Sequence, residues 1–211
     1  MASKTPRRSF SRSSSSFSYR RRFVLSTEGR ITEPEYFRHL LEFCPHVVVE
    51  CLKTDGKSAP PYVLKRIKKS LKETPLERRD EAWLLVDKDK WAHDQLQPLW
   101  EWAQKDERRN LAISCPAFDF WLLLHFEEGS GAHSLQVCRA RLRKLDSRYD
   151  KSIAGLKGKF TLDAVKQAIE RARNRDCPHS APYSGTPGCT GVYRLVERIL
   201  EAEGEWRDGH P

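Results

Sequence analysis

The sequence predicts an α/β fold: a parallel sheet of about four strands, flanked by helices and followed by a helical C-terminal part. Four short apolar runs, at 23–27, 47–52, 82–86 and 110–114, have the length and apolar character of buried strands. Segments with helical spacing separate these runs, and parallel neighbours need such crossover connections. The chain of 211 residues is long enough to bury one sizeable core.

The helices are expected between and after these strands. The first should begin at Thr32, because Thr32 and Glu35 have the spacing of a capping box and Pro34 occupies a tolerant first turn. In the second, at 60–72, apolar residues fall on one face and most basic residues on the other. A helical stretch interrupted by Pro98 follows the third strand. Further helical segments are predicted at 118–126, 134–145, 161–174 and 191–203.

Positive charge is concentrated at the N-terminus. Residues 1–22 contain seven lysine and arginine side chains and no acid, so they supply most of the net charge of +9. They also contain eight serines and few apolar residues, so this segment cannot bury enough surface to fold alone. We expect a disordered basic arm that binds phosphate backbones or an acidic partner through charge, or a solvated tail with no partner. The α/β core should then span 23–130, with a helical extension at 131–211 packed on or beside it.

The composition also bears on the compartment. No apolar run approaches the length of a membrane span, and the N-terminus lacks the apolar segment of a secretory signal. We therefore expect a cytoplasmic protein with no membrane partner. The six cysteines include no C-x-x-C pair, so the sequence suggests neither a disulfide framework nor a four-ligand zinc site. The thiols are expected to be reduced.

Acidic residues follow three of the predicted strands. Asp87 and Asp89 come directly after the run 82–86 and, because side chains alternate along an extended chain, both can point the same way. Glu28 follows the first strand, and Asp119 follows the fourth at the start of a helix. Ligands of open α/β sheets collect beyond the carboxyl ends of the strands, so these acids should share one rim. Such a cluster repels itself unless cations neutralise it, which favours a hard cation such as Mg²⁺.

Each of these acids also has a plainer interpretation. Asp87 and Asp89 could merely begin a surface loop. Asp119 could supply the negative charge that a helix N-terminus favours. The convergence of several strand ends, rather than any single acid, is what favours a metal site.

Several further stretches complete a recognisable pattern. They are Ser26–Gly29, Thr32–Phe37, Val86–Asp89, Ser114–Phe126, Tyr149–Lys151 and Thr190–Glu197. A glutamate and a glycine after the first strand, with Asp-x-Asp after the third, resemble the Toprim domain of topoisomerases, primases and overcoming-lysogenisation-defect nucleases. The closer resemblance, over roughly 20–200, is to the RloB/AbiLii family. These are small Toprim-like proteins of bacterial phage-defence and abortive-infection loci, commonly encoded beside an ABC-type ATPase.

The resemblance implies a nuclease that cleaves phosphodiester bonds of DNA or RNA with Mg²⁺ or Mn²⁺. Asp87 and Asp89 would hold the ion, and Asp119 would bind it directly or orient a ligand water. Glu28 would bind a second ion or act as general acid/base. The same resemblance implies an ABC-type ATPase as a partner, and it leaves open whether the chain forms a homo-oligomer.

Three lysines are candidates for steering the phosphate or offsetting developing charge: Lys57, Lys88 and Lys151. The alternative for each is a solvated surface role. The sequence also departs from the family pattern, since Cys115 stands where Asn is common and Asp119 where Glu is common. These departures concern the geometry at the fourth strand.

Two other functions compete with a nuclease. Haloacid-dehalogenase-type phosphatases also place Asp-x-Asp after a strand, but usually the first strand, whereas Asp87 and Asp89 follow the third. The second alternative is a catalytically weak interaction subunit that docks to the ATPase. Retention of all the acids argues against it, and an exposed apolar patch would favour it.

Overall fold

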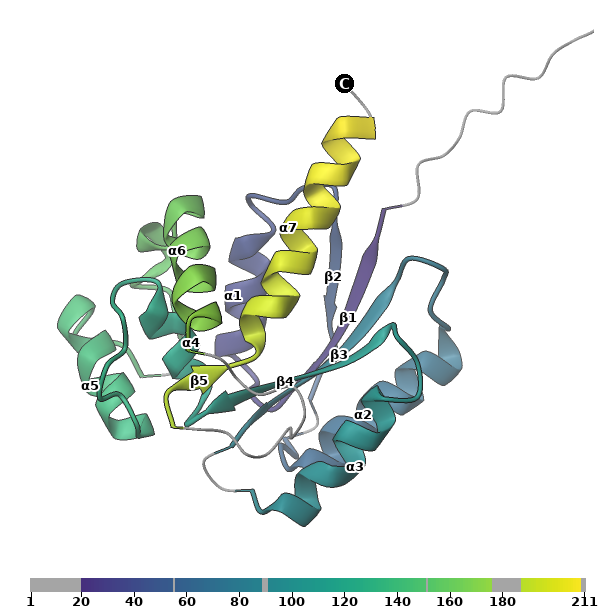
Figure 1. Cartoon of the computed structure of the whole chain (residues 1–211), viewed down its shortest axis with the longest axis horizontal. Coiled ribbons are helices and arrows are strands. Elements are labelled where there is room, and N and C mark those ends of the chain that lie inside the picture. The colour runs from purple at the N-terminus through teal and green to yellow at the C-terminus, as the bar shows by residue number, and fades with distance from the viewer. Residues whose placement is uncertain (1–19, 55, 89–90, 151, 176–186, 210–211) are drawn as a thin grey trace, which may run out of the picture.

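The computed structural model describes residues 20–54, 56–88, 91–150, 152–175 and 187–209. Within these ranges the chain forms a mixed α/β structure in which helices cover both faces of one sheet (Figure 1). This arrangement confirms the predicted fold class, including the helical C-terminal part.

The sheet has five strands among the described residues, in the order β2-β1-β3-β4-β5. They are β1 (Arg22–Thr27), β2 (Val48–Cys51), β3 (Glu81–Asp87), β4 (Arg109–Cys115) and β5 (Cys189–Thr190). The first four are parallel to their neighbours, and β5 is antiparallel to β4. The sequence analysis missed β5 because a strand of two residues is too short to show a periodic pattern.

Helices lie on both sides of this sheet. On one side are α2 (Pro60–Glu73) and α3 (His93–Ala103) (Figure 1). The other side carries α1 (Thr32–Leu40), α4 (Phe118–Leu124), α5 (Leu135–Leu145), α6 (Leu162–Arg173) and α7 (Val192–Gly209), with a short 3₁₀ helix at Lys157–Lys159. None of the helices in the described ranges has the length and apolar character needed to cross a membrane.

Alternation along β3 divides the core into two layers. Leu84 and Val86 belong to the cluster on the α2 and α3 side, together with Ile67. Trp83 and Leu85 belong to the cluster on the opposite side. A parallel strand covered on both faces is apolar at every position, which is why this segment reads as one continuous apolar run.

The C-terminal helices contribute to the same core as the sheet. Leu142 of α5, Ile169 of α6 and Ile199 of α7 belong to one hydrophobic cluster with Phe23 of β1 and Trp121 of α4. The helices after residue 131 therefore complete one face of the sheet.

The folded part begins earlier than the predicted end of the arm. Arg22 opens β1, and its Nε donates to Asp80 Oδ2 at 3.1 Å. Arg21 forms an ion pair with Glu81. The sequence analysis assigned both arginines to the arm on the basis of composition. In the structure, the buried acids Asp80 and Glu81 at the start of β3 bind them. Residues 1–19 lie outside the described residues.

The helix α1 begins at Thr32 as predicted, but its predicted capping box and the predicted break at Pro98 are wrong. The N-cap of α1 is Ile31, without a side-chain cap, and Glu35 instead accepts hydrogen bonds from Ser152 Oγ at 2.8 Å and Ile153 N at 2.9 Å. The carboxylate of Glu35 therefore binds Ser152 and Ile153, which are distant in sequence, and does not form the predicted capping box. The second error concerns Pro98, which lies inside a continuous α3 rather than interrupting it. The apolar face of α3 packs on the sheet on both sides of this proline.

The cysteines depart from expectation at one position. Cys189 is disulfide-bonded. The free thiols among the described residues are those of Cys44, Cys51, Cys115 and Cys138. A disulfide requires the two Cα atoms to lie within about 7 Å, and that proximity is a property of the tertiary fold rather than of cysteine spacing.

Candidate active site

The candidate site lies at the carboxyl end of the parallel strands, where β1 and β3 end beside each other. Glu28 follows β1, and its backbone N–H donates to Leu85 O of β3 at 3.0 Å. Its Oε2 accepts hydrogen bonds from Asp87 N at 3.2 Å and from Trp91 Nε1 at 3.0 Å. The structure therefore brings Glu28 and Asp87 together.

Asp87 is the last residue of β3 and also contacts the start of α4. Its Oδ1 accepts a hydrogen bond from Phe118 N at 2.9 Å. Removal from water, followed by the negative charges of Glu33, Glu28 and Asp119, raises the pKa of this carboxyl well above its usual range. Among the described residues no lysine, arginine or histidine forms an ion pair with it. The site thus holds an aspartate whose negative charge is poorly compensated.

Glu33 is a further acid of the cluster, and the sequence analysis did not single it out. It lies in the first turn of α1, is 4% exposed, and accepts a hydrogen bond from Gly29 N at 2.8 Å through Oε1. Burial is the main cause that raises the pKa of Glu33 to about 7, and the charges of Asp119 and Glu28 add to it. The backbone hydrogen bonds act in the opposite direction.

One sequence signal could have identified Glu33. A Cβ atom at Gly29 would overlap the Glu33 carboxylate, so the glycine beside Glu28 makes room for the second acid. Glycine at a strand end followed four residues later by a glutamate is therefore the informative spacing. It was ambiguous because an acid in the first turn of a helix is also favoured by the helix dipole.

Asp119 lies in the first turn of α4 and is buried. Its Oδ1 accepts hydrogen bonds from Tyr149 OH at 2.9 Å and from Arg139 Nε at 3.2 Å. Burial, together with the nearby Asp119 charge, raises the pKa of Tyr149, so the phenol stays protonated as the donor. Asp119 therefore adds negative charge to the cluster while an arginine already balances part of it.

Basic side chains near the site are held by backbone carbonyls. Lys88 Nζ donates to Trp91 O at 3.1 Å. Arg66 of α2 donates from Nη1 to Thr27 O at 2.9 Å and from Nη2 to Lys57 O at 2.9 Å. Arg66 thus joins α2, the loop before it and the residue next to Glu28, although its sequence position suggested only a solvated basic face.

Two predicted site residues, Asp89 and Lys151, lie outside the described residues. Within the described ranges, no group of three or more histidine, cysteine, aspartate or glutamate side chains is arranged to hold a metal ion. The donor chemistry nevertheless fits a hard divalent cation, because Glu28, Asp87 and Glu33 offer carboxylate oxygens. Their mutual repulsion, seen in the raised pKa values of Asp87 and Glu33, is the condition that a cation relieves.

Comparison with known proteins gives one match. No curated protein and no solved structure shows significant similarity to this chain. A family model described as "RloB-like protein" matches residues 23–199, which include nearly all of β1, the strands β2 to β5, the acid cluster and the first part of α7. Because the match covers most of the sequence, the chain belongs to the RloB-like family.

Proposed function

We propose that this protein cleaves phosphodiester bonds of nucleic acid with Mg²⁺ or Mn²⁺ held at the carboxyl end of β1 and β3. The observation that carries the proposal is the crowding of Glu28, Glu33 and Asp87, which lie just after β1, in the first turn of α1 and at the end of β3. Membership of the RloB-like family fits a phage-defence association and is compatible with this activity.

The residues have distinct proposed roles. Glu28 and Asp87 would hold the ion together with Asp89, and the bound ion would supply charge stabilisation for the attacking and leaving oxygens. Phe118 N fixes the orientation of Asp87 through Oδ1. Trp91 Nε1 does the same for Glu28 through Oε2.

Glu33 is the proposed general acid/base. A group whose pKa is about 7 exchanges a proton readily near neutral pH, which is what proton transfer to or from a phosphate oxygen requires. The hydrogen bond from Gly29 N to Oε1 holds the carboxyl in place during that exchange. Asp119, balanced by Arg139, contributes negative charge to the cluster and orients the start of α4.

The competing docking function receives less support. The large apolar side chains that are exposed among the described residues come from four different segments of the chain, one from each: Ile31, Val48, Tyr62 and Leu145. We therefore propose that an ATPase partner acts as an activator of cleavage. Free nuclease activity would endanger the host, so the isolated protein is expected to be nearly silent until the ATPase and ATP are supplied.

The test is divalent-dependent cleavage of single-stranded DNA, duplex DNA and tRNA. Wild type is compared with Asp87→Asn, alone and with the neighbouring ATPase and ATP, in Mg²⁺ and in Mn²⁺. Metal binding is followed separately by thermal unfolding, since an ion that binds only the native state raises Tm. Asp163→Asn, an exposed first-turn acid of α6, is the matched control.

We expect Asp87→Asn to lose both the metal-induced rise in Tm and cleavage, while Asp163→Asn retains both. If wild type never exceeds Asp87→Asn on any substrate, the nuclease proposal fails. If Asp87→Asn still shows the full Tm response, the metal site lies elsewhere.

A further inference from the structure

The lysines of α2 and the arginines of α5 differ in their ion-pair partners. On α5, every arginine has an acidic partner: Arg139 pairs with Asp119, Arg141 with Glu127 and Arg143 with Asp150. Of the lysines of α2, Lys69 lies 3.9 Å through Nζ from the exposed Glu73 within the same helix, and the other three have no ion-pair partner among the described residues. Most of the lysine charge on α2 is thus not neutralised by acids among the described residues.

This charge pattern costs stability in the isolated protein. Lys65 and Lys69 are four residues apart, as are Lys68 and Lys72, so like charges neighbour each other along the helix. Like charges at this spacing destabilise a helix. A bound polyanion would remove that cost. The lysines therefore indicate a negatively charged ligand better than they indicate structural ion pairs.

The first turn of α2 is attached to the active-site end of β1. Ser26 Oγ donates to Val63 O at 2.8 Å, and Arg66 Nη1 donates to Thr27 O at 2.9 Å. Residue 27 immediately precedes Glu28. A nucleic-acid strand bound along the lysines of α2 would therefore extend toward the carboxylate cluster. We call this lysine-bearing surface of α2 the track.

An exposed aromatic ring marks the end of this track nearest to the site. Tyr62, in the first turn of α2, is 41% exposed, and Lys57 Nζ lies 5.1 Å from the centre of its ring. Aromatic rings beside cations are the platforms on which single-stranded nucleic acids stack their bases. Duplexes keep their base faces covered, so an exposed tyrosine favours a single strand.

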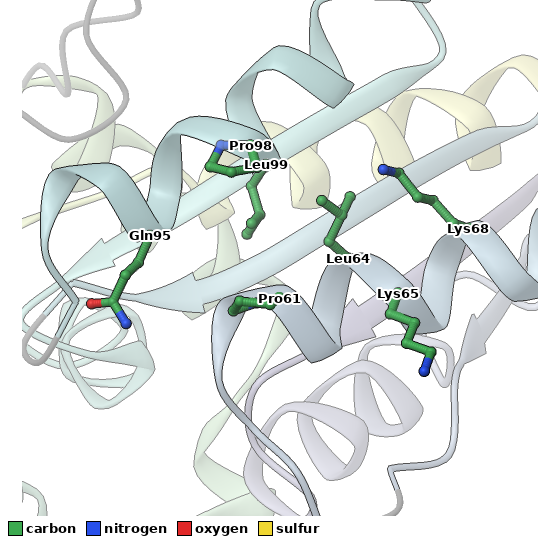
Figure 2. A pocket seen from close by; sticks show the side chains of 7 residues that line it. All are labelled: Pro61, Leu64, Lys65, Lys68, Gln95, Pro98 and Leu99. Atoms are coloured by element: carbon green, nitrogen blue, oxygen red, sulfur yellow. The ribbon is translucent and has the colours of Figure 1, made fainter.

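A groove continues from the track between α2 and α3. Figure 2 shows Pro61, Leu64, Lys65 and Lys68 on the α2 side and Gln95, Pro98 and Leu99 on the α3 side. Its volume is about 320 Å³. Its floor is mainly apolar and its α2 rim carries ammonium groups, a combination suited to a base and its neighbouring phosphates.

We infer that α2 binds single-stranded nucleic acid, with Tyr62 stacking on a base beside the active site and the lysines of α2 contacting the phosphates. This inference rests on the proposed nuclease function for its orientation toward the site. It adds the class of substrate and the surface that receives it. The binding itself needs no metal, so it can be measured independently of cleavage.

The test is fluorescence anisotropy of the full-length protein in EDTA with a labelled single-stranded DNA, a single-stranded RNA and the DNA duplex. Tyr62→Ala should weaken single-strand binding on the order of tenfold, and Tyr62→Phe should retain it because stacking needs only the ring. Lys65→Gln with Lys68→Gln should reduce the slope of log affinity against log salt by about 1.4. Lys144→Gln with Lys166→Gln, exposed lysines of α5 and α6, is the matched control.

The outcomes separate the two proposals. The proposed binding surface on α2 is overturned if Tyr62→Ala binds single strands as well as wild type does. It is also overturned if wild type prefers the duplex. The proposal also fails if the control variant Lys144→Gln with Lys166→Gln loses as much of the salt slope as Lys65→Gln with Lys68→Gln. Binding would then depend on surface lysines in general rather than on those of α2. If Tyr62→Ala weakens binding but no condition produces cleavage, the track stands and the nuclease proposal falls. Circular dichroism melts verify that each variant is folded.

Discussion

β3 begins and ends with an acidic residue, and the two acids have opposite surroundings. Glu81, the first residue, is 4% exposed and accepts a hydrogen bond from Arg198 Nη2 at 2.6 Å; Arg21 pairs with the same carboxylate. Asp87, the last residue, accepts a hydrogen bond from Phe118 N, and the charges that act on it most strongly are those of other acids. At the start of β3 the acid is paired with arginines, whereas at its end several acids lie close together.

The difference separates structural acids from site acids. A buried carboxylate that is paired with arginine stays charged and holds the fold together. A buried carboxylate beside other carboxylates raises the free energy of the native state until a proton or a metal ion neutralises it. The crowded end of the sheet is therefore the end where a ligand is needed.

The largest effect should come from exchanging the two acids for their amides. Glu81→Gln leaves Arg21 and Arg198 without their shared carboxylate, so the free energy of unfolding should fall by about 4 kcal/mol. Asp87→Asn removes a repelled charge, so without metal the stability should stay the same or rise. Urea unfolding at neutral pH measures both, with Glu170→Gln, at an exposed position of α6, as control. Equal losses in the two variants would contradict the comparison.

The next effect is a pH dependence at the crowded end. Burial raises the pKa of Glu33 to about 7 in the folded protein, above the ordinary glutamate value of 4.5, so the native state binds more protons than the unfolded state between these limits. The stability contributed by protonated Glu33 is therefore full below pH 4.5 and is lost as pH rises through 7, by on the order of 3 kcal/mol.

Unfolding in EDTA from pH 4.5 to pH 8 tests this slope. Glu33→Gln should flatten it, because the amide does not titrate. A divalent cation should also reduce it, because the ion replaces the proton as the neutralising charge. A slope that persists unchanged in Glu33→Gln would assign the pH dependence to another group.

A catalytic effect follows from Glu28. Glu28→Gln removes a charge and nearly preserves shape, so nucleic-acid binding should survive while cleavage falls by on the order of 10². Single-turnover cleavage, with and without the ATPase partner, measures the chemical step. Cleavage by Glu28→Gln at the wild-type rate would exclude Glu28 from the mechanism.

The smallest effect on the fold is expected at the N-terminus. Removing residues 2–19 deletes four cationic side chains but leaves Arg21 and Arg22 bound to their acids, so the stability should not change. The salt slope of nucleic-acid binding should decrease by at most about 3 if all four contact phosphates of a single strand. Anisotropy titrations at several salt concentrations decide this, and an unchanged slope would give the arm another role.

The sequence by itself determined the parallel sheet and two of the site acids. Continuous apolar runs separated by amphipathic helices require crossovers, and crossovers place all carboxyl ends at one edge. Acids that follow such runs, as Glu28 and Asp87 do, must then meet at that edge. This inference needs only chain order and side-chain alternation, which are local properties.

The tertiary structure alone decided the partners of each charge. Glu33 was not singled out in the sequence, and Arg66 looked like a solvated cation, until the fold placed Gly29 against one and Thr27 against the other. Asp119 resembled a free ligand until Arg139 of α5 reached it. A sequence shows which side chains carry charge, whereas the compensation of that charge depends on residues that only long-range packing brings within a few ångströms.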